Sequence, residues 1–346
     1  MIRRALGLGM VGLLILGVSG SAGAPVPEGP RLAVVKFGVE PPRLELLTVD
    51  ARGALPVRLV GGGERAKLLP FPLAAPSWSP DGSQIAFTGW IGATREKGTQ
   101  TKVFVMSADG SGLHAVPGTT EGYGPVFAPD GHTLAFARLR QRQVRGRHGS
   151  SRTESAAAIW LADLAGGPSR RLTPWRDGLE NLPSSFSPDG TVLALSRDRP
   201  GRGGPEAVAM RLDGTGSTVL ARNASQPVYS PDGSEVAFVR VQERRLETTS
   251  DLFAMNADGS QARRLTKTPG KLESWPSWDP SGERLAYAQF GSGSLADLLG
   301  LGNAVMQINA DGSCRKKLLS ERGAAFYGPA WQPGPGREAG RVECAS

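Results

Sequence analysis

A short pattern of apolar and turn-forming residues recurs along most of the chain. One copy places Trp78 before the turn Ser79-Pro80-Asp81-Gly82 and follows it with the apolar run Ile85-Ala86-Phe87. Proline presets φ at the second turn position, aspartate accepts local backbone hydrogen bonds, and glycine adopts the left-handed conformation. Each copy therefore predicts a tight hairpin between two short β-strands.

The copies recur with a period of roughly 40 to 50 residues, with one longer interval, which is typical of a β-propeller built from short strands. Their turn prolines are Pro80, Pro129, Pro188, Pro231, Pro280 and Pro333, and the last copy is degenerate. A second turn, such as Asn256-Ala257-Asp258-Gly259, predicts a third and a fourth strand in the repeat. Four antiparallel strands make one propeller blade.

The two ends of the chain are expected to complete one blade together. Residues 31–60 lack the hairpin turn but contain three apolar runs, at 32–37, 44–49 and 56–60. The missing inner strand matches Gly328-Pro329-Ala330-Trp331 at the other end. We therefore expect an all-β fold: a six-bladed β-propeller with four antiparallel strands per blade, its first blade closed by the N- and C-terminal strands.

These repeats resemble those of the TolB-type, WD40-like propellers, which are marked by the W-S-P-D-G turn, the apolar-Ala-Phe strand and the N-A-D-G turn. The resemblance covers nearly all of residues 31–331. It implies a propeller like the C-terminal domain of TolB, which in that family docks a peptidoglycan-associated lipoprotein. The chain departs from TolB in lacking the separate N-terminal domain. The repeat itself serves unrelated functions, so it specifies the fold and not the ligand.

The N-terminus has the pattern of a secretory signal. Arg3-Arg4 precedes the apolar residues 5–18, a run too short for an ordinary membrane span, and Ala22-Gly23-Ala24 offers a cleavage site. We expect residues 1–24 to be a signal peptide and residues 25–346 to form the propeller of a periplasmic or secreted protein. An uncleaved N-terminal anchor is the alternative.

The two cysteines, Cys314 and Cys344, are expected to form a disulfide in an exported protein. Such a bond would attach the C-terminal tail to the last full blade. Two unpaired thiols are the alternative, because sequence alone does not fix their geometry.

Two groups of residues are candidates for binding. Both kinds of tight turn lie on one face of a propeller, so the longer inserts, which we expect to be irregular loops and which include residues 138–155, lie on the opposite face, where binding residues are more usual. Aromatic and acidic residues just before the inner strands predict a pocket at the mouth of the central channel: Tyr123, Trp175, Trp275 and Tyr327 with Glu121, Glu180 and Glu273. Packing between blades and ordinary solvation are the alternatives for these residues.

The net charge is +8, and part of it is concentrated in the insert at residues 138–155. Arg140, Arg142, Arg145 and Arg147 lie there and are candidates for holding an anionic partner. In an exported protein that partner is an envelope protein, an acidic peptide or an anionic polymer rather than nucleic acid. A solvated loop without a partner is the alternative.

The sequence offers no catalytic constellation. The histidines, His114, His132 and His148, have no metal-ligand spacing, and no G-x-S-x-G motif is present. We therefore expect a monomeric, non-enzymatic binding module without a cofactor or metal. The alternative is a propeller hydrolase or lactonase that uses a channel-bound cation and carboxylates such as Glu121, Glu180 or Glu273.

Overall fold

The computed structural model describes residues 30–39, 42–60, 75–91, 100–145, 151–199, 203–213, 215–244, 247–291, 303–334 and 342–344. The expected signal peptide and Arg147 lie outside the described residues. Within these ranges, no helix has the length and apolar character needed to cross a bilayer.

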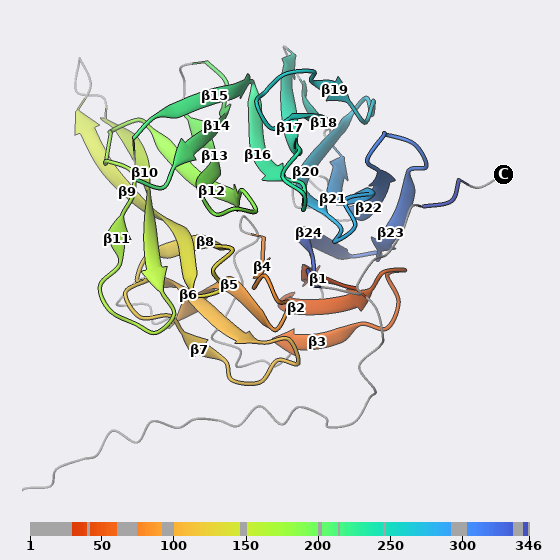
Figure 1. Cartoon of the computed structure of the whole chain (residues 1–346), viewed down its shortest axis with the longest axis horizontal. Helices are drawn as coiled ribbons and strands as arrows, with labels where there is room; N and C mark the ends of the chain where they lie inside the picture. Colours follow the sequence, from red (N-terminus) through yellow and green to blue (C-terminus); the bar gives the residue numbers. More distant parts are fainter. Residues whose placement is uncertain are drawn as a thin grey trace, which may run out of the picture.

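The strands form small antiparallel sheets that stand around a common centre (Figure 1). In two of them the strands are paired in the same order as they occur along the chain. The sheet β4-β5-β6-β7 contains β4 (Ser77–Trp78), β5 (Gln84–Ile91), β6 (Gln100–Ser107) and β7 (His114–Ala115). The sheet β16-β17-β18-β19 contains β16 (Ala224–Tyr229), β17 (Glu235–Arg244), β18 (Glu247–Asn256) and β19 (Arg263–Arg264).

A third sheet of this kind, β20-β21-β22-β23, contains β20 (Lys271–Trp278), β21 (Arg284–Gly291), β22 (Ala304–Asn309) and β23 (Lys316–Ser320). An eight-stranded sheet contains β8 (Gly122–Phe127), β9 (Thr133–Arg145), β10 (Ser151–Asp163), β11 (Arg170–Arg171), β12 (Glu180–Phe186), β13 (Val192–Asp198), β14 (Glu206–Arg211) and β15 (Ser217–Arg222). Its halves, β8–β11 and β12–β15, are joined by one parallel pair, Ala157 opposite Glu180.

The remaining sheet joins the two ends of the chain. Its order is β24-β1-β2-β3, from β24 (Ala324–Trp331), β1 (Arg31–Val39), β2 (Pro42–Asp50) and β3 (Val57–Val60). Leu32 lies opposite Trp331, and the pairing continues to Gly38 opposite Ala324. The expected closure of one blade by the N- and C-terminal strands is thereby confirmed.

The repeated sequence motif accounts for the core. The last residue of each apolar run occupies one repeat position, and there Phe87, Phe136, Leu195, Phe238 and Tyr287 are almost completely buried. Adjacent sheets pack against each other through buried apolar side chains. For example, Leu32 and Val34 of β1 contact Ala286 of β21 and Val305 of β22. Because each sheet buries both faces against its neighbours, the inner strands are held at fixed positions around the centre.

The turn aspartates have the structural role that their sequence context predicts. Asp81 Oδ1 accepts hydrogen bonds from Ser79 Oγ at 2.6 Å and from the Ser83 N–H at 3.0 Å. The bond from Ser79, followed by those from Ser83, lowers the pKa of Asp81. The same arrangement recurs at Asp189 and Asp232.

The structure corrects the expectation that residues 138–155 form an irregular loop. Here β9 and β10 each run for 13 residues and stay paired out to Arg145 opposite Ser151. Residues 146–150 lie outside the described residues. The described part of the basic insert is therefore a long β-hairpin, which we call the β9–β10 arm. The hairpin of β17 and β18 is extended in the same way, with pairing out to Arg244 opposite Glu247.

Candidate functional site

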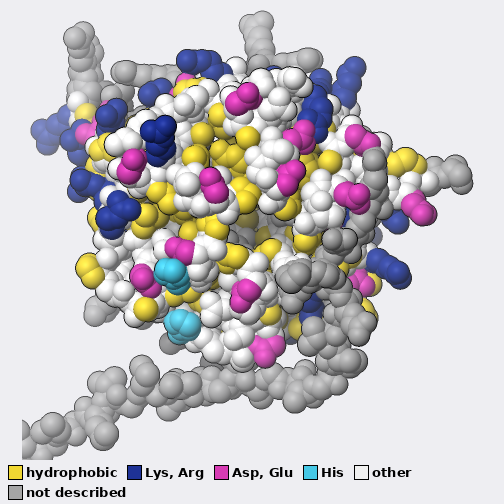
Figure 2. All heavy atoms as spheres, viewed as in Figure 1, with side chains coloured by type: hydrophobic (Ala, Val, Ile, Leu, Met, Phe, Trp, Pro, Cys, Tyr) yellow, Lys and Arg dark blue, Asp and Glu magenta, His cyan; other side chains and the backbone are white. Residues whose placement is uncertain are grey.

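A cavity of about 730 Å³ lies at the centre of the ring. Its lining residues come from all the strands nearest the axis, namely β4, β8, β12, β16, β20 and β24. Figure 2 shows hydrophobic side chains gathered in the central hollow, with Asp and Glu side chains distributed around it. A concave, mainly apolar space of this size is the usual form of a binding site.

Prolines at two levels line this cavity. One set lies within the inner strands or, for Pro76, directly before β4, and comprises Pro76, Pro125, Pro183, Pro276 and Pro329. The second set lies at the matching positions after the inner strands, four of them in P-D-G turns, and comprises Pro80, Pro129, Pro188, Pro231, Pro280 and Pro333. The pairing of the inner strands shifts register at the first set, for example between Tyr123 and Val126. Proline has no N–H to donate, so a β-bulge is where a strand tolerates it.

The lining is almost free of accessible charge. Asp279 is the one carboxylate among the lining residues that the structure describes, and it has no exposed surface. The neutral polar lining residues include serines, such as Ser184 and Ser196, together with Gln226 and the tyrosines Tyr123 and Tyr229. The cavity therefore suits a ligand whose inserted part is apolar or uncharged.

Three aromatic rings meet at the edge of the cavity away from the P-D-G turns. The ring centroid of Trp275, a lining residue, lies 5.9 Å from that of Phe290 and 5.9 Å from that of Tyr327. The centroids of Phe290 and Tyr327 are 5.7 Å apart. All three side chains are half-buried, so they offer a partly exposed apolar surface beside the cavity.

Trp275 has a backbone conformation that is rare for a bulky residue. Its φ is 54°, and the residues at the matching repeat positions, Gly124, Gln226 and Gly328, also have positive φ. The N–H of Trp275 bonds to Gln226 Oε1 at 2.6 Å, and that of Gln226 bonds to Ser196 Oγ at 2.7 Å. A non-glycine residue in this strained conformation costs on the order of 1–3 kcal/mol of folding free energy, and such residues cluster at functional sites.

The structure brings part of the predicted pocket together. Tyr123 and Trp275 both line the cavity, and Tyr327 contacts Trp275. Burial, followed by the charge of Glu180, raises the pKa of Tyr123, so its hydroxyl stays neutral. Trp175 does not line this cavity. Its ring lies under Arg140 of the β9–β10 arm, with the guanidinium carbon 5.1 Å from the ring centroid.

The three predicted glutamates do not converge on the cavity. Glu121 is exposed and acts electrostatically on Arg138. Glu180 accepts a short hydrogen bond from Ser155. Glu273 has no exposed surface, so the prediction that it lines the pocket is corrected. Among the described residues, no three His, Cys, Asp or Glu side chains form a metal-binding group. The carboxylates of the hydrolase alternative are thus not assembled into one site.

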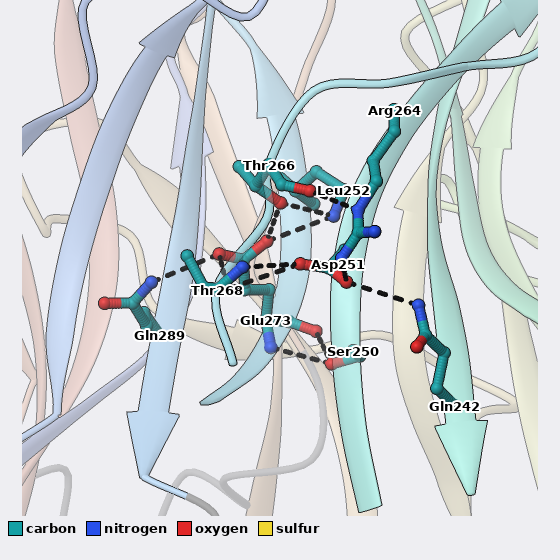
Figure 3. Close-up of polar contacts among 9 residues, drawn as sticks. All are labelled: Gln242, Ser250, Asp251, Leu252, Arg264, Thr266, Thr268, Glu273 and Gln289. Carbon is teal, nitrogen blue, oxygen red and sulfur yellow. Dashed lines mark hydrogen bonds and ion pairs between the residues drawn. The ribbon is translucent and has the colours of Figure 1, made fainter. Parts of the chain in front are cut away.

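Glu273 belongs instead to a polar cluster between β18 and β20 (Figure 3). Its carboxylate accepts hydrogen bonds from Thr266 and Thr268, from the N–H of Leu252 at 3.0 Å and from Gln289 at 3.1 Å. The neighbouring Asp251 bonds the N–H of Thr268 at 3.0 Å. Burial is the main cause that raises the pKa of Glu273, and these hydrogen bonds oppose it.

Three of the predicted arginines, Arg140, Arg142 and Arg145, lie along the β9–β10 arm, apart from the cavity. Arg142 pairs with Asp177 at 2.8 Å and with Glu154 at 3.4 Å. Arg140 stacks on Trp175, and Arg145 is exposed at the end of β9.

The structure joins Cys314 and Cys344 in a disulfide, with their Cα atoms 4.7 Å apart. The backbone of the adjacent Val342 is held by the side chain of Asn309. The Val342 N–H donates to Asn309 Oδ1 at 2.8 Å, and Asn309 Nδ2 donates to the Val342 carbonyl at 3.1 Å. The described tail residues are therefore fixed against β22.

Sequence reasoning missed most of the lining. It assigned the motif residues Trp78, Trp278 and Trp331 to turns and packing, and it did not consider the strand prolines. A signal was available, because residues at one repeat position on every inner strand must face the axis together. That argument would have selected the prolines and the residues that precede them.

Comparison with known sequences identifies relatives of one kind. The family described as TolB beta propeller domain matches residues 72–334. The Tol-Pal system protein TolB of Anaeromyxobacter dehalogenans is 38% identical over 118 residues, which are 34% of this chain and 25% of that protein. TolB of Francisella tularensis subsp. mediasiatica is 24% identical over 265 residues, which are 76% of this chain and 54% of that protein. The chain thus matches about a quarter to a half of the length of these relatives.

Solved structures agree with the fold. The crystal structure of TolB from Acinetobacter baumannii superposes with a TM-score of 0.64 and 21% sequence identity, covering 88% of this chain and 67% of that one. At this identity the similarity establishes a shared propeller fold and leaves the ligand open.

Proposed function

The chain belongs to the TolB β-propeller domain family, and on this premise we propose that it is a non-enzymatic binding protein that docks a protein or peptide segment at its central cavity. The observation that carries the proposal is the cavity itself, about 730 Å³ in volume and lined by every inner strand. Its lack of accessible charge favours an apolar segment of the partner.

The proposed entry point is the edge of the cavity near Trp275, on the face opposite the P-D-G turns. The aromatic group of Trp275, Phe290 and Tyr327 supports this choice, because aromatic side chains in half-buried positions are enriched at binding sites. The positive φ of Trp275 supports it as well.

We count each half of the eight-stranded sheet as a separate blade, which makes six blades in the proposed ring. The halves repeat the order of the other sheets, and one parallel residue pair connects them. With that count, each blade contributes one inner strand to the cavity lining.

We place the protein outside the cytoplasm as a monomer, with residues 1–24 removed as a signal peptide and residues 25–346 forming the propeller. The disulfide between Cys314 and Cys344 supports an oxidising compartment. The partner is then an envelope or extracellular protein. The names of the relatives point to a Tol-Pal system, and whether this chain acts in one is part of what the binding experiment decides.

The experiment is site-specific photocrosslinking in the host cell. A photoreactive amino acid replaces Ser184, which lines the cavity, or Val219, which is exposed on the outer strand β15. We expect a discrete adduct with one protein from position 184 and none from position 219. The proposal fails if position 184 yields no adduct, or if the same adduct forms from both positions.

A further inference from the structure

We propose that the arginines around Trp175 form a second binding site, separate from the central cavity, for an anionic polysaccharide. This basic patch comprises Arg140 of β9, Arg176 in the link before β12, Arg197 and Arg199 at the end of β13, and Arg222 of β15. The inference uses the extracytoplasmic location from the proposed function, but it does not depend on what the cavity binds.

The elements that carry the basic patch are held close together. The link before β12 lies on β10, because the Gly178 N–H donates to the Ser155 carbonyl at 3.0 Å and the Ala157 N–H donates to the Leu179 carbonyl at 3.0 Å. Strand β13 pairs with β12, with Arg197 opposite Asn181. Figure 2 shows Lys and Arg side chains gathered at the upper left of the ring, where Figure 1 places the ends of β9 and β10.

Positive charge predominates on the elements that carry the basic patch. Their carboxylates are Asp177, beside Arg176, and Asp198, between Arg197 and Arg199. Asp177 is paired with Arg142 at 2.8 Å, and Glu206 of β14 is shared, at 2.8 Å from Arg222 and 3.8 Å from Arg199. Among the residues that the structure describes, no carboxylate lies within 4.0 Å of Arg140 or Arg176, and Arg197 bonds the neutral amide of Asn181 at 3.2 Å.

The arginines also repel one another. Burial is the first cause that lowers the pKa of Arg197. Glu206 opposes that shift, and the positive charges of Arg199 and Arg176 add to it. An anion placed among these three side chains would relieve the repulsion. Their mutual proximity is therefore better suited to binding an anion than to stabilising the fold.

Arg140 is arranged as a receptor for a carboxylate or phosphate. Its guanidinium carbon lies 5.1 Å from the centroid of the Trp175 ring, so a cation–π contact holds the charge over the indole. The N–H groups of a guanidinium match the two oxygens of a carboxylate.

The spread of the charges favours a polymer. The five arginines come from four parts of the fold: β9, the link before β12, the end of β13, and β15. A small anion would reach one or two of these side chains, whereas a flexible chain with a charge on each unit follows all of them. The half-buried Trp175 adds an apolar surface against which the ring of a sugar can pack.

The test is binding of the full-length protein to sodium alginate, a carboxylated polysaccharide, measured by isothermal titration calorimetry at low and at moderate salt. Neutral dextran, poly-glutamate and single-stranded DNA of similar length are the comparison probes. The variant Arg140→Gln/Arg176→Gln/Arg199→Gln removes three charges from the basic patch. A matched control, Arg52→Gln/Lys316→Gln/Arg322→Gln, removes three exposed charges elsewhere.

We expect alginate to bind more tightly than each comparison probe and to weaken as salt rises. The patch variant should bind it at least about tenfold more weakly than the control variant, because several charge-assisted hydrogen bonds are lost. Equal affinity of the two variants would overturn the proposal. Binding of poly-glutamate, DNA or dextran at least as tight as that of alginate would also overturn it. The crosslink from position 184 should persist in the patch variant, so failure at one site is distinguishable from failure at the other.

Discussion

Gln332 donates its backbone N–H to the carbonyl oxygen of Arg31 at 2.8 Å, although the two residues lie near opposite ends of the chain. The same hydrogen bond closes the hairpins of the repeats within the chain, as from the Ser79 N–H to the Gln84 carbonyl at 2.9 Å and from the Asp279 N–H to the Arg284 carbonyl at 3.0 Å. The closure between the chain ends therefore reproduces the geometry of an ordinary repeat, with the turn replaced by the two ends.

Replacement of Leu32 by alanine tests this closure. Leu32 is fully buried, lies opposite Trp331 and packs against β21 and β22. Leu32→Ala should lower the free energy of unfolding by about 2–5 kcal/mol, because it leaves a cavity where the chain ends meet. Leu113→Ala, at an exposed position, should change it by less than about 0.5 kcal/mol. Urea denaturation measures both, and equal effects would contradict the role of Leu32.

The buried ion pair of Asp279 and Arg284 gives a second prediction. Their side chains approach to 3.3 Å, and both residues are at most 5% exposed. Asp279→Ser with Ser281→Asp restores the usual S-P-D-G turn but leaves Arg284 buried without its carboxylate. We expect a loss of about 3–5 kcal/mol in unfolding free energy.

Adding Arg284→Gln to that variant is the control, because Gln84 occupies the matching position after the turn of β4 and β5. Most of the lost stability should return. If the third substitution destabilises the protein further, Asp279 is not needed to neutralise Arg284.

The pH dependence of stability should reveal Glu273. Its pKa is raised above the usual 4.5 in the folded protein, so the folded state binds this proton more tightly than the unfolded chain. The resulting stabilisation is complete below pH 4.5 and is lost as the pH rises through the folded pKa. The stability advantage of the wild type over Glu273→Gln should therefore shrink as the pH rises from 4.5 through the raised pKa of the folded protein.

Denaturation curves across that range provide the measurement, with the exposed Glu121→Gln as the control. A constant difference between wild type and Glu273→Gln would show that Glu273 does not bind its proton more tightly on folding.

Loss of the disulfide should destabilise the closed ring. The bond links residues separated by 30 positions, and a loop of this length corresponds to about 3–4 kcal/mol in the chain-entropy account. Cys314→Ser/Cys344→Ser should lower the thermal midpoint, and reductant should lower that of the wild type to the same value. A midpoint that does not respond to reductant would count against a bridge in the purified protein.

Much of the fold could be predicted because the repeat is a local signal. The Pro-Asp-Gly turns, the buried aromatic positions such as Phe87 and Phe136, and the pairing of Leu32 with Trp331 all follow from motif and spacing. The β9–β10 arm was predicted as a loop because its arginines masked the alternation of a strand. Cross-strand pairing from Arg138 to Arg145 outweighs that polar composition.

The candidate site was harder to predict because it depends on contacts between repeats. Glu273 resembles a solvated loop residue until Thr266 and Thr268, from the end of the preceding repeat, enclose it. Trp175 and Trp275 were both expected just before inner strands, but Trp275 lies within β20. The bulge before Pro276 directs one toward the axis, while the arm covers the other.

The most direct test of a partner docked at the central cavity is hydrogen–deuterium exchange on the full chain, with and without the protein captured from position 184. The account predicts new protection at the inner strands that flank the cavity, within Gly122–Phe127, Glu180–Phe186 and Lys271–Trp278. Protection confined to the β9–β10 arm or to the outer strands β15 and β23, with the inner strands unchanged, would contradict it.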